Sequence, residues 1–264
     1  MIAHLVSLMA SRPPTERKNY AREYLQVYLL RMLHEAKAHS HLAFVGGTAL
    51  RLLHGLPRFS EDLDFSWEPV RASSPQDLAG TFRTVKTSLE RAGYTVSAKM
   101  TSGSAVTAAL FRFERLPIEL GWSQDPRIAL TIKVEVDVRP PAGAGIETTL
   151  IQRVFPVAVR HYDLPSLFAG KLNAILTRSF TKGRDWFDLA WYLTEHRGLE
   201  PNAALLSNAL AQFGQAADAV PWREAIRRKL ASLRWAEVLA DLEPFVERRS
   251  DLDHLQPSLI AKLL

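Results

Sequence analysis

The feature that most constrains the fold is a pair of glycines followed by two closely spaced acids. Phe44–Leu50 is an apolar run interrupted by Gly46 and Gly47, which predicts a strand, a tight turn and then a short helix. Asp62 and Asp64 lie within a second apolar run. Because alternate side chains of a strand share a face, we expect both carboxylates to point the same way.

Two carboxylates on one face repel each other, and burying them is costly unless a cation lies between them. Hard oxygen ligands suit Mg²⁺ or Mn²⁺, so we expect Asp62 and Asp64 to bind such a metal. The backbone amides of a glycine turn at a helix start can bind phosphate. We therefore expect Gly46, Gly47 and Thr48 to contact a nucleoside triphosphate (NTP). The alternative is a strand-to-helix corner with no ligand.

Arg58 and Ser60 come just before the acidic pair. Arg58 can neutralise phosphate, and Ser60 can hydrogen-bond a phosphate or a metal ligand. Both are alternatively ordinary loop residues.

A third carboxylate is expected on the strand predicted over residues 128–138. Lys133, Glu135 and Asp137 alternate there with apolar residues and so share one face. Either acid can complete a metal site. The alternative is a solvated charged face on an edge strand.

The hydrophobic periodicity changes near residue 162. Before it, helices are predicted over 16–38, 48–54 and 75–92, and strands over 42–45, 62–67, 94–100, 105–113, 128–138 and 152–159. After it, helices are predicted over 166–179, 184–196, 203–213, 222–233, 235–246 and 259–264. We therefore predict an α/β (α+β) lobe with a mixed sheet and an N-terminal helix over 1–162. A helical lobe follows over 163–264, which makes the chain bilobal.

The overall composition indicates which kinds of partner and which cellular compartment to expect. The 264 residues carry a net charge of +5, which favours an anionic partner such as RNA or a nucleotide. No apolar run approaches the roughly 20 residues of a membrane span, and no secretory signal is evident. The absence of cysteine excludes disulfides and thiolate chemistry. We expect a cytoplasmic protein without a membrane partner.

A second group of charged residues lies on the first two helices of the helical lobe. Lys171 and Arg178 are seven residues apart and share a helix face. Asp185 and Asp188 share a face of the next helix, where Arg184 and Asp188 are spaced to pair. The group is either part of a phosphate site or a salt-bridge network between helices.

The glycine turn followed by Ser60-x-Asp62-x-Asp64 resembles the signature of the nucleotidyltransferase superfamily. The string from Phe44 to Phe65 is similar, more narrowly, to the AbiEii/AbiGii family of toxin nucleotidyltransferases, which includes MenT-like proteins. The resemblance implies that Glu135 is the third metal ligand, with Asp137 in reserve. Residues 171–189 resemble the family's C-terminal motif. That likeness implies that Lys171 reaches the triphosphate and that Asp185 or Asp188 orients it or acts as a base.

The same resemblance implies an activity and its setting. It implies a metal-dependent transfer of a nucleoside monophosphate (NMP) from an NTP, with Mg²⁺ or Mn²⁺ as cofactor. The implied acceptor is the 3′ end of transfer RNA (tRNA), so that translation is blocked, and the implied setting is a toxin–antitoxin or phage-defence pair. The alternatives are a small-molecule acceptor such as an aminoglycoside, a protein hydroxyl, or a catalytically dead module that binds nucleotide or RNA.

Overall fold

The computed structural model describes residues 2–70, 74–214 and 221–264. The chain divides into two compact units. The first comprises Met1–Leu53, Ser60–Pro140 and Thr148–His161, and the second comprises His54–Phe59, Pro141–Glu147 and Tyr162–Leu264. The boundary predicted between residues 162 and 163 takes no account of the two short earlier segments that group with the second unit.

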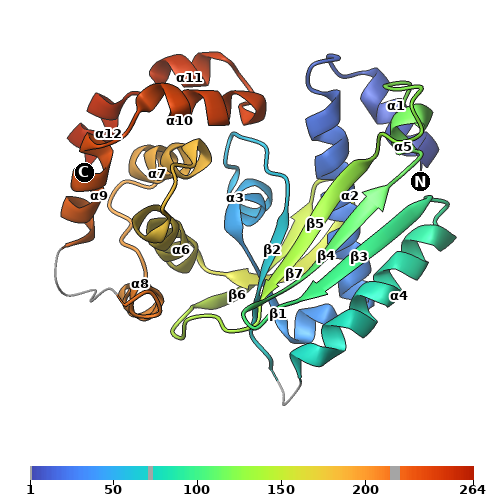
Figure 1. The fold of residues 1–264 in the computed structure, drawn as a ribbon, viewed down its shortest axis with the longest axis horizontal. Coiled ribbons are helices and arrows are strands. Elements are labelled where there is room, and N and C mark those ends of the chain that lie inside the picture. Colours follow the sequence, from blue (N-terminus) through green and yellow to red (C-terminus); the bar gives the residue numbers. More distant parts are fainter. Residues whose placement is uncertain (1, 71–73, 215–220) are drawn as a thin grey trace. The chain divides into compact units, whose positions relative to one another are not determined.

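Among the described residues, seven strands form one mixed sheet, in agreement with the predicted fold class (Figure 1). The strands are β1 (Leu42–Val45), β2 (Leu63–Trp67), β3 (Val96–Ser102), β4 (Val106–Phe113), β5 (Leu130–Asp137), β6 (Ile146–Gln152) and β7 (Pro156–Tyr162). Their order is β3-β4-β5-β2-β1-β7-β6. β2 pairs with β1 in an antiparallel and with β5 in a parallel direction, so β2 lies in the interior of the sheet.

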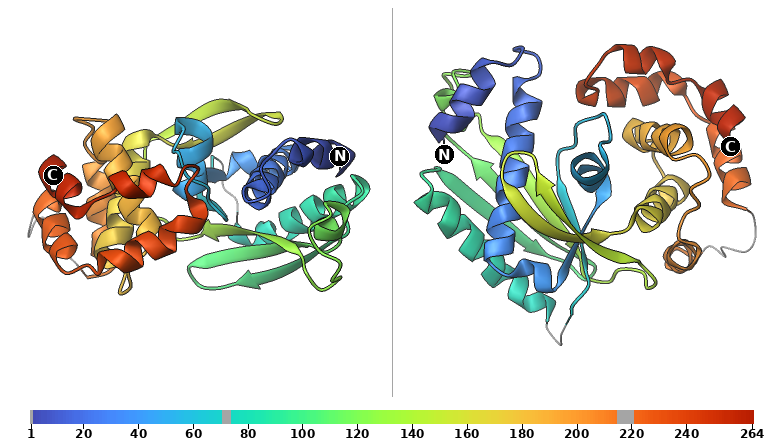
Figure 2. Two further views of the ribbon diagram at one scale, coloured as in Figure 1. Left: turned by 90° about the horizontal axis from the view of Figure 1, so that it is seen from above. Right: turned by 180° about the vertical axis from the view of Figure 1, so that it is seen from behind.

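Helices pack against one face of this sheet, and the polar residues of β5 lie on the opposite face. The helices before β7 are α1 (Ile2–Ala10), α2 (Arg17–Glu35), α3 (Gly46–His54), α4 (Leu78–Arg91) and α5 (Leu116–Glu119), with short 3₁₀ helices at Ala38–Ser40 and Pro75–Asp77. α2 and α4 pack against each other and against the sheet (Figures 1 and 2). Along β5, burial alternates strictly: Leu130, Ile132, Val134 and Val136 are buried, and the residues between them are half-buried. The charged residues of β5 therefore occupy the face opposite the apolar core.

The strand predicted over 152–159 is wrong as a single element, because residue 152 ends β6 and residues 156–159 belong to β7. The chain bends at Arg153, Val154 and Phe155, which separates β6 from β7. The reason is tertiary packing, because the Phe155 ring lies against Tyr24 and Tyr28 of α2, at centroid distances of 5.4 and 5.5 Å. Phe155 therefore packs against α2 at the bend between β6 and β7.

Helices make up most of the second unit. They are α6 (Leu164–Thr177), α7 (Gly183–Glu195), α8 (Ala203–Ala211), α9 (Trp222–Ala231), α10 (Trp235–Leu242), α11 (Ser250–His254) and α12 (Pro257–Leu263), with a 3₁₀ turn at Glu243–Phe245. α6 packs against α7, α8 and α9, and α7 packs against α10 and α12. The Asp163 carboxylate caps α6 by accepting from Ser166 N. A Cβ at Gly183 would overlap the Val238 carbonyl, so the glycine permits close contact between α7 and α10.

In the described part of the chain, no helix combines the length and the apolar character needed to cross a lipid bilayer.

Candidate active site

The glycine turn and the first acids are fitted directly to each other. Gly46 begins α3 with a φ of +80°, which favours glycine. A Cβ at this position would overlap the carboxylate of Asp64. The buried Thr48 donates its hydroxyl to the backbone carbonyl of Asp62, which ties the helix to the acidic segment. The glycine turn and the Asp-x-Asp segment therefore form one local structure.

The strand register decides which acid of β5 is next to Asp64. Asp64 pairs with Val45 of β1 and with Glu135 of β5. Directly paired residues on adjacent strands point to the same face, so the Asp64 and Glu135 side chains are neighbours. Asp137 pairs with Ser66 instead, and its carboxylate accepts from the backbone N–H of Arg139. Glu135 is therefore the closer neighbour of Asp64.

Lys133 completes this cluster on the polar face of β5. Its Nζ lies 2.6 Å from Glu135 Oε1. The hydrogen bond to Glu135 raises the pKa of the Lys133 ammonium group, and the charges of Asp62 and Asp64 raise it further. Three acids and one lysine thus share a region of negative potential, which attracts cations.

The carboxylates in this cluster suit a hard divalent cation. Within residues 2–70, 74–214 and 221–264, no three His, Asp or Glu side chains converge closely enough to hold a metal ion by themselves. Mg²⁺ commonly takes only one or two protein carboxylates and fills its other positions with water and phosphate oxygens. Asp62 and Asp64 match that requirement in number. Glu135, which pairs with Lys133, stays the predicted third ligand.

Two polar side chains of helix α2, which the sequence did not single out, contact the acidic segment before β2. Gln26 Nε2 donates to the carbonyl oxygen of Ser60 at 3.1 Å, and Arg22 Nη2 lies 3.3 Å from Glu61 Oε1. Gln26 and Arg22 are 1% and 8% exposed. The sequence does contain a signal for these contacts, because Arg22 and Gln26 are polar residues four positions apart and so share one face of a helix.

In the second unit, Asp188 is the centre of a buried ion-pair network. Arg58 donates to both Asp188 oxygens, each at 2.6 Å, and Lys171 Nζ lies 2.6 Å from Asp188 Oδ2. Burial by itself raises the pKa of the Asp188 carboxyl, but the charges and hydrogen bonds of Arg58 and Lys171 outweigh it and hold that pKa below its usual value. Asp188 is therefore an anion that fixes two cations. A phosphate contact by Arg58, which is 1% exposed, stays a prediction.

Asp185 links the same lysine to a second cation. Lys171 Nζ lies 3.2 Å from Asp185 Oδ1, and Arg178 pairs with the other Asp185 oxygen. The predicted spacing thus brings the charged faces of α6 and α7 together. Lys171 is held by two carboxylates, which fixes its direction. Its role at a triphosphate is not decided by these contacts and remains a proposal.

Comparison with known proteins settles the family. A family model described as the nucleotidyl transferase AbiEii toxin of a type IV toxin–antitoxin system matches residues 28–257. The chain belongs to the AbiEii family. This AbiEii protein is therefore a toxin nucleotidyltransferase, and its family implies an NTP substrate and an antitoxin.

Solved structures agree with the fold of this AbiEii protein. A candidate nucleotidyltransferase from H. pylori is 18% identical with a TM-score of 0.55, over 89% of this chain and 90% of the other. JHP933 from Helicobacter pylori is 20% identical with a TM-score of 0.55, over 91% of this chain and 89% of the other. No curated protein matches the chain.

Proposed function

We propose that this AbiEii protein transfers an NMP from an NTP to the 3′ end of tRNA in the cytoplasm, with Mg²⁺ or Mn²⁺ as cofactor, and thereby blocks translation. The observation that carries the metal-dependent part is the register of β2 and β5, in which Asp64 pairs with Glu135. The same Asp64 carboxylate lies close to Gly46. The net charge of +5 supports an RNA acceptor over a cationic small molecule such as an aminoglycoside.

The proposed reaction exchanges one phosphorus–oxygen bond for another. The acceptor hydroxyl oxygen bonds to the α-phosphorus, the bond from that phosphorus to the bridging oxygen of the β-phosphate breaks, and pyrophosphate leaves. The hydroxyl proton passes to a carboxylate of the cluster or to water. Little other covalent chemistry is needed, so positioning and charge neutralisation supply most of the acceleration.

In this proposal each motif has a separate task. Asp62, Asp64 and Glu135 would hold the divalent metal, which supplies the positive charge that the triphosphate requires. The backbone at Gly46 and Gly47 allows a phosphate to approach closely.

The remaining predicted residues bind or orient the triphosphate. Lys171 would contact it, with Asp188 and Asp185 fixing the direction of the ammonium group. Thr48 and Ser60 would add hydrogen bonds, and Arg58 would contribute positive charge.

The test is a labelling experiment with purified protein. The protein is incubated with Mg²⁺, total RNA and each of the four labelled NTPs in turn. We expect label at tRNA 3′ ends, lost in Asp64→Asn and in Lys171→Gln. Asp125→Asn is the matched control, because Asp125 is a carboxylate that pairs with Arg127 on the surface of the first unit.

Three results would contradict the proposal. Label on protein would mean that a protein hydroxyl is the acceptor. Absence of label with every NTP would mean that the site is inactive on RNA. Unchanged labelling by Asp64→Asn would mean that the β2 carboxylates do not serve the reaction.

A further inference from the structure

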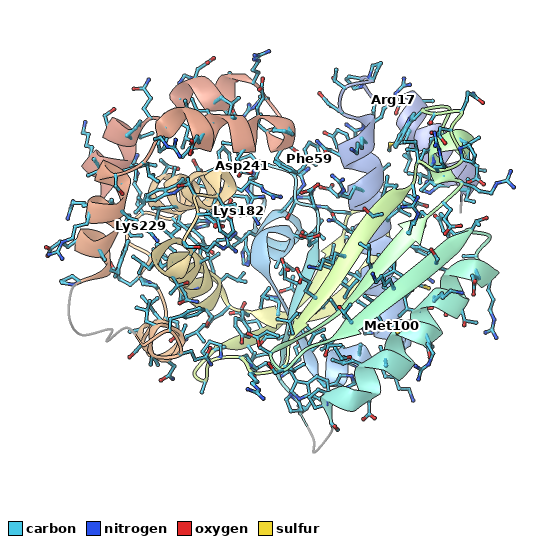
Figure 3. The ribbon with its side chains drawn as sticks, viewed as in Figure 1. Arg17, Phe59, Met100, Lys182, Lys229 and Asp241 are labelled. Atoms are coloured by element: carbon cyan, nitrogen blue, oxygen red, sulfur yellow. The ribbon has the colours of Figure 1, made fainter. Side chains whose placement is uncertain are left out.

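The loop between α6 and α7 exposes an aromatic ring among cations. Phe180 is 65% exposed, and Ser179 and Thr181 beside it are exposed as well. The Arg178 guanidinium lies 5.9 Å from the centroid of the Phe180 ring. Lys182 ends the loop just before α7 (Figure 3). Proteins that bind single-stranded nucleic acid combine exposed aromatic rings with cations, because bases stack on the rings and phosphates pair with the cations.

A cavity of about 170 Å³ lies under this loop. Its lining comes from the end of α6, the loop, the first turn of α7 and α9, and includes Arg178, Phe180, Lys182, Asp185, Trp186 and Lys229. The charged residues of the lining are three cations and one acid. That acid, Asp185, already pairs with Arg178 and Lys171, so the cavity favours an anion.

Two lysines of the lining differ in what holds them. Lys229 Nζ donates to the backbone carbonyls of Ile175, Leu176 and Arg178, so it serves the structure of the cavity wall. Lys182 accepts a hydrogen bond from Asp185 N through its backbone carbonyl. Its ammonium group, by contrast, has neither a hydrogen bond nor an ion pair with any residue that the structure describes.

The surroundings of Lys182 also disfavour its positive charge. Burial lowers the pKa of its ammonium group, and the nearby charges of Arg184, Arg178 and Lys171 lower it further, while Asp185 acts in the opposite direction. A phosphate beside Lys182 would offset that repulsion.

We propose that the loop from Arg178 to Lys182 binds the single-stranded 3′ end of the RNA acceptor, with Phe180 stacked on an unpaired base and Lys182 against an adjacent phosphate. The inference rests on the proposed function, since it requires RNA as the acceptor. The exposure of the loop favours a strand that passes over the surface, because a mononucleotide substrate is normally enclosed.

The test compares Phe180→Ala, Phe180→Trp and Lys182→Gln with two controls. Phe213→Ala removes another exposed ring of the second unit, one that is 60% exposed, and Lys262→Gln removes another exposed cation. The dissociation constant is measured with a fluorescent single-stranded oligoribonucleotide, and KM is measured separately for tRNA and for the NTP.

We expect Phe180→Ala to raise the RNA dissociation constant and the KM for tRNA by about 5- to 100-fold, with the KM for the NTP unchanged. Phe180→Trp keeps near-normal values, because it still presents a ring. A plot of log RNA affinity against log salt concentration has a negative slope. Lys182→Gln makes that slope less steep by about 0.7, the value for one phosphate contact on a single strand. Both controls behave as the unaltered protein.

The results separate this inference from the proposed function. If the unaltered protein labels tRNA and Phe180→Ala does so with an unchanged KM for tRNA, the loop assignment is overturned and the function stands. If Phe180→Ala raises only the KM for the NTP, the loop serves the other substrate and the inference is wrong. If the unaltered protein labels no RNA, both fail together.

Discussion

Because Gly46 has no Cβ, the carboxylate of Asp64, a proposed metal ligand, can lie against the backbone there. The φ of +80° and the approach of the Asp64 carboxylate both require glycine. We expect Gly46→Ala to lower the rate of nucleotide transfer by about 100-fold, the cost of moving a reacting group by roughly 1 Å.

The control for this change is Gly93→Ala. Gly93 also has a positive φ, of +95°, but nothing lies within 4 Å of its added Cβ. Both variants should lose about 1 to 2 kcal/mol of stability, because an L residue is strained at positive φ. Equal rates in the two variants, measured as NMP incorporated per minute, would show that the contact with Asp64 is unimportant.

The Asp188 carboxylate provides a prediction about stability and its pH dependence. Asp188→Asn leaves Arg58 and Lys171 without their buried partner, so we expect a loss of about 3 to 5 kcal/mol in unfolding free energy at pH 7. The pKa of Asp188 is lowered in the folded state. Its stabilising contribution is therefore complete above the ordinary pKa of about 3.9 and is lost as the pH falls through the lowered value.

Urea unfolding at several pH values measures this effect. The stability difference between the unaltered protein and Asp188→Asn should narrow below about pH 4. The exposed residue Asp253 offers the control, because Asp253→Asn should stay within about 0.5 kcal/mol of the unaltered protein. A difference that stays constant down to the acid limit would contradict the assigned role.

At the scale of elements, the sequence predicts those whose pattern is local. The alternation along β5 and the glycine turn at α3 each mark their element within a few residues. α1 escaped prediction because a helix of nine residues is marginal by itself, and this one is held by packing against α2. The separate strand β6 was missed because only the contacts of Phe155 reveal the turn after it.

The end of α6 supplies a prediction at the same scale. The last carbonyls of a helix lack partners within the helix, and Lys229 of α9 donates to those of Ile175 and Leu176 as well as to Arg178 beyond them. We expect Lys229→Met to lower the unfolding free energy by about 1 to 3 kcal/mol, the value of hydrogen bonds to a charged group. Arg228→Gln on the same helix is the control, because Arg228 is exposed and forms an ion pair with Glu224 of its own helix. Equal urea midpoints for the two variants would rule out a capping role.

At the scale of the whole molecule, the sequence identifies the candidate residues but not their partners. Asp62 and Asp64 are candidates from their spacing, and Lys171 is a candidate from the resemblance to the family's C-terminal motif; the three roles stay predictions. The choice of Glu135 as the neighbour of Asp64 depends on a parallel pairing between β2 and β5, which no local pattern contains. The pair between Arg58 and Asp188 joins residues 130 positions apart, so only the folded chain reveals it.

The charge of each unit leads to the last prediction. In the first unit, Asp62 and Glu135 lie near Asp64. In the second unit, the cations Arg58, Lys171 and Arg178 are held by Asp185 and Asp188. A metal–NTP complex needs carboxylates for its cation and cations for its phosphates, so removing either set should weaken its binding.

A non-hydrolysable NTP analogue with Mg²⁺, at about 100 times its dissociation constant, should stabilise the protein by about 2.7 kcal/mol and raise the melting temperature. Asp64→Asn and Lys171→Gln should each lose most of that shift, and so should the unaltered protein when EDTA removes the Mg²⁺. Phe213→Ala should keep it. A full shift in EDTA would mean that nucleotide binding does not depend on the metal, and the carboxylate cluster would then need another role.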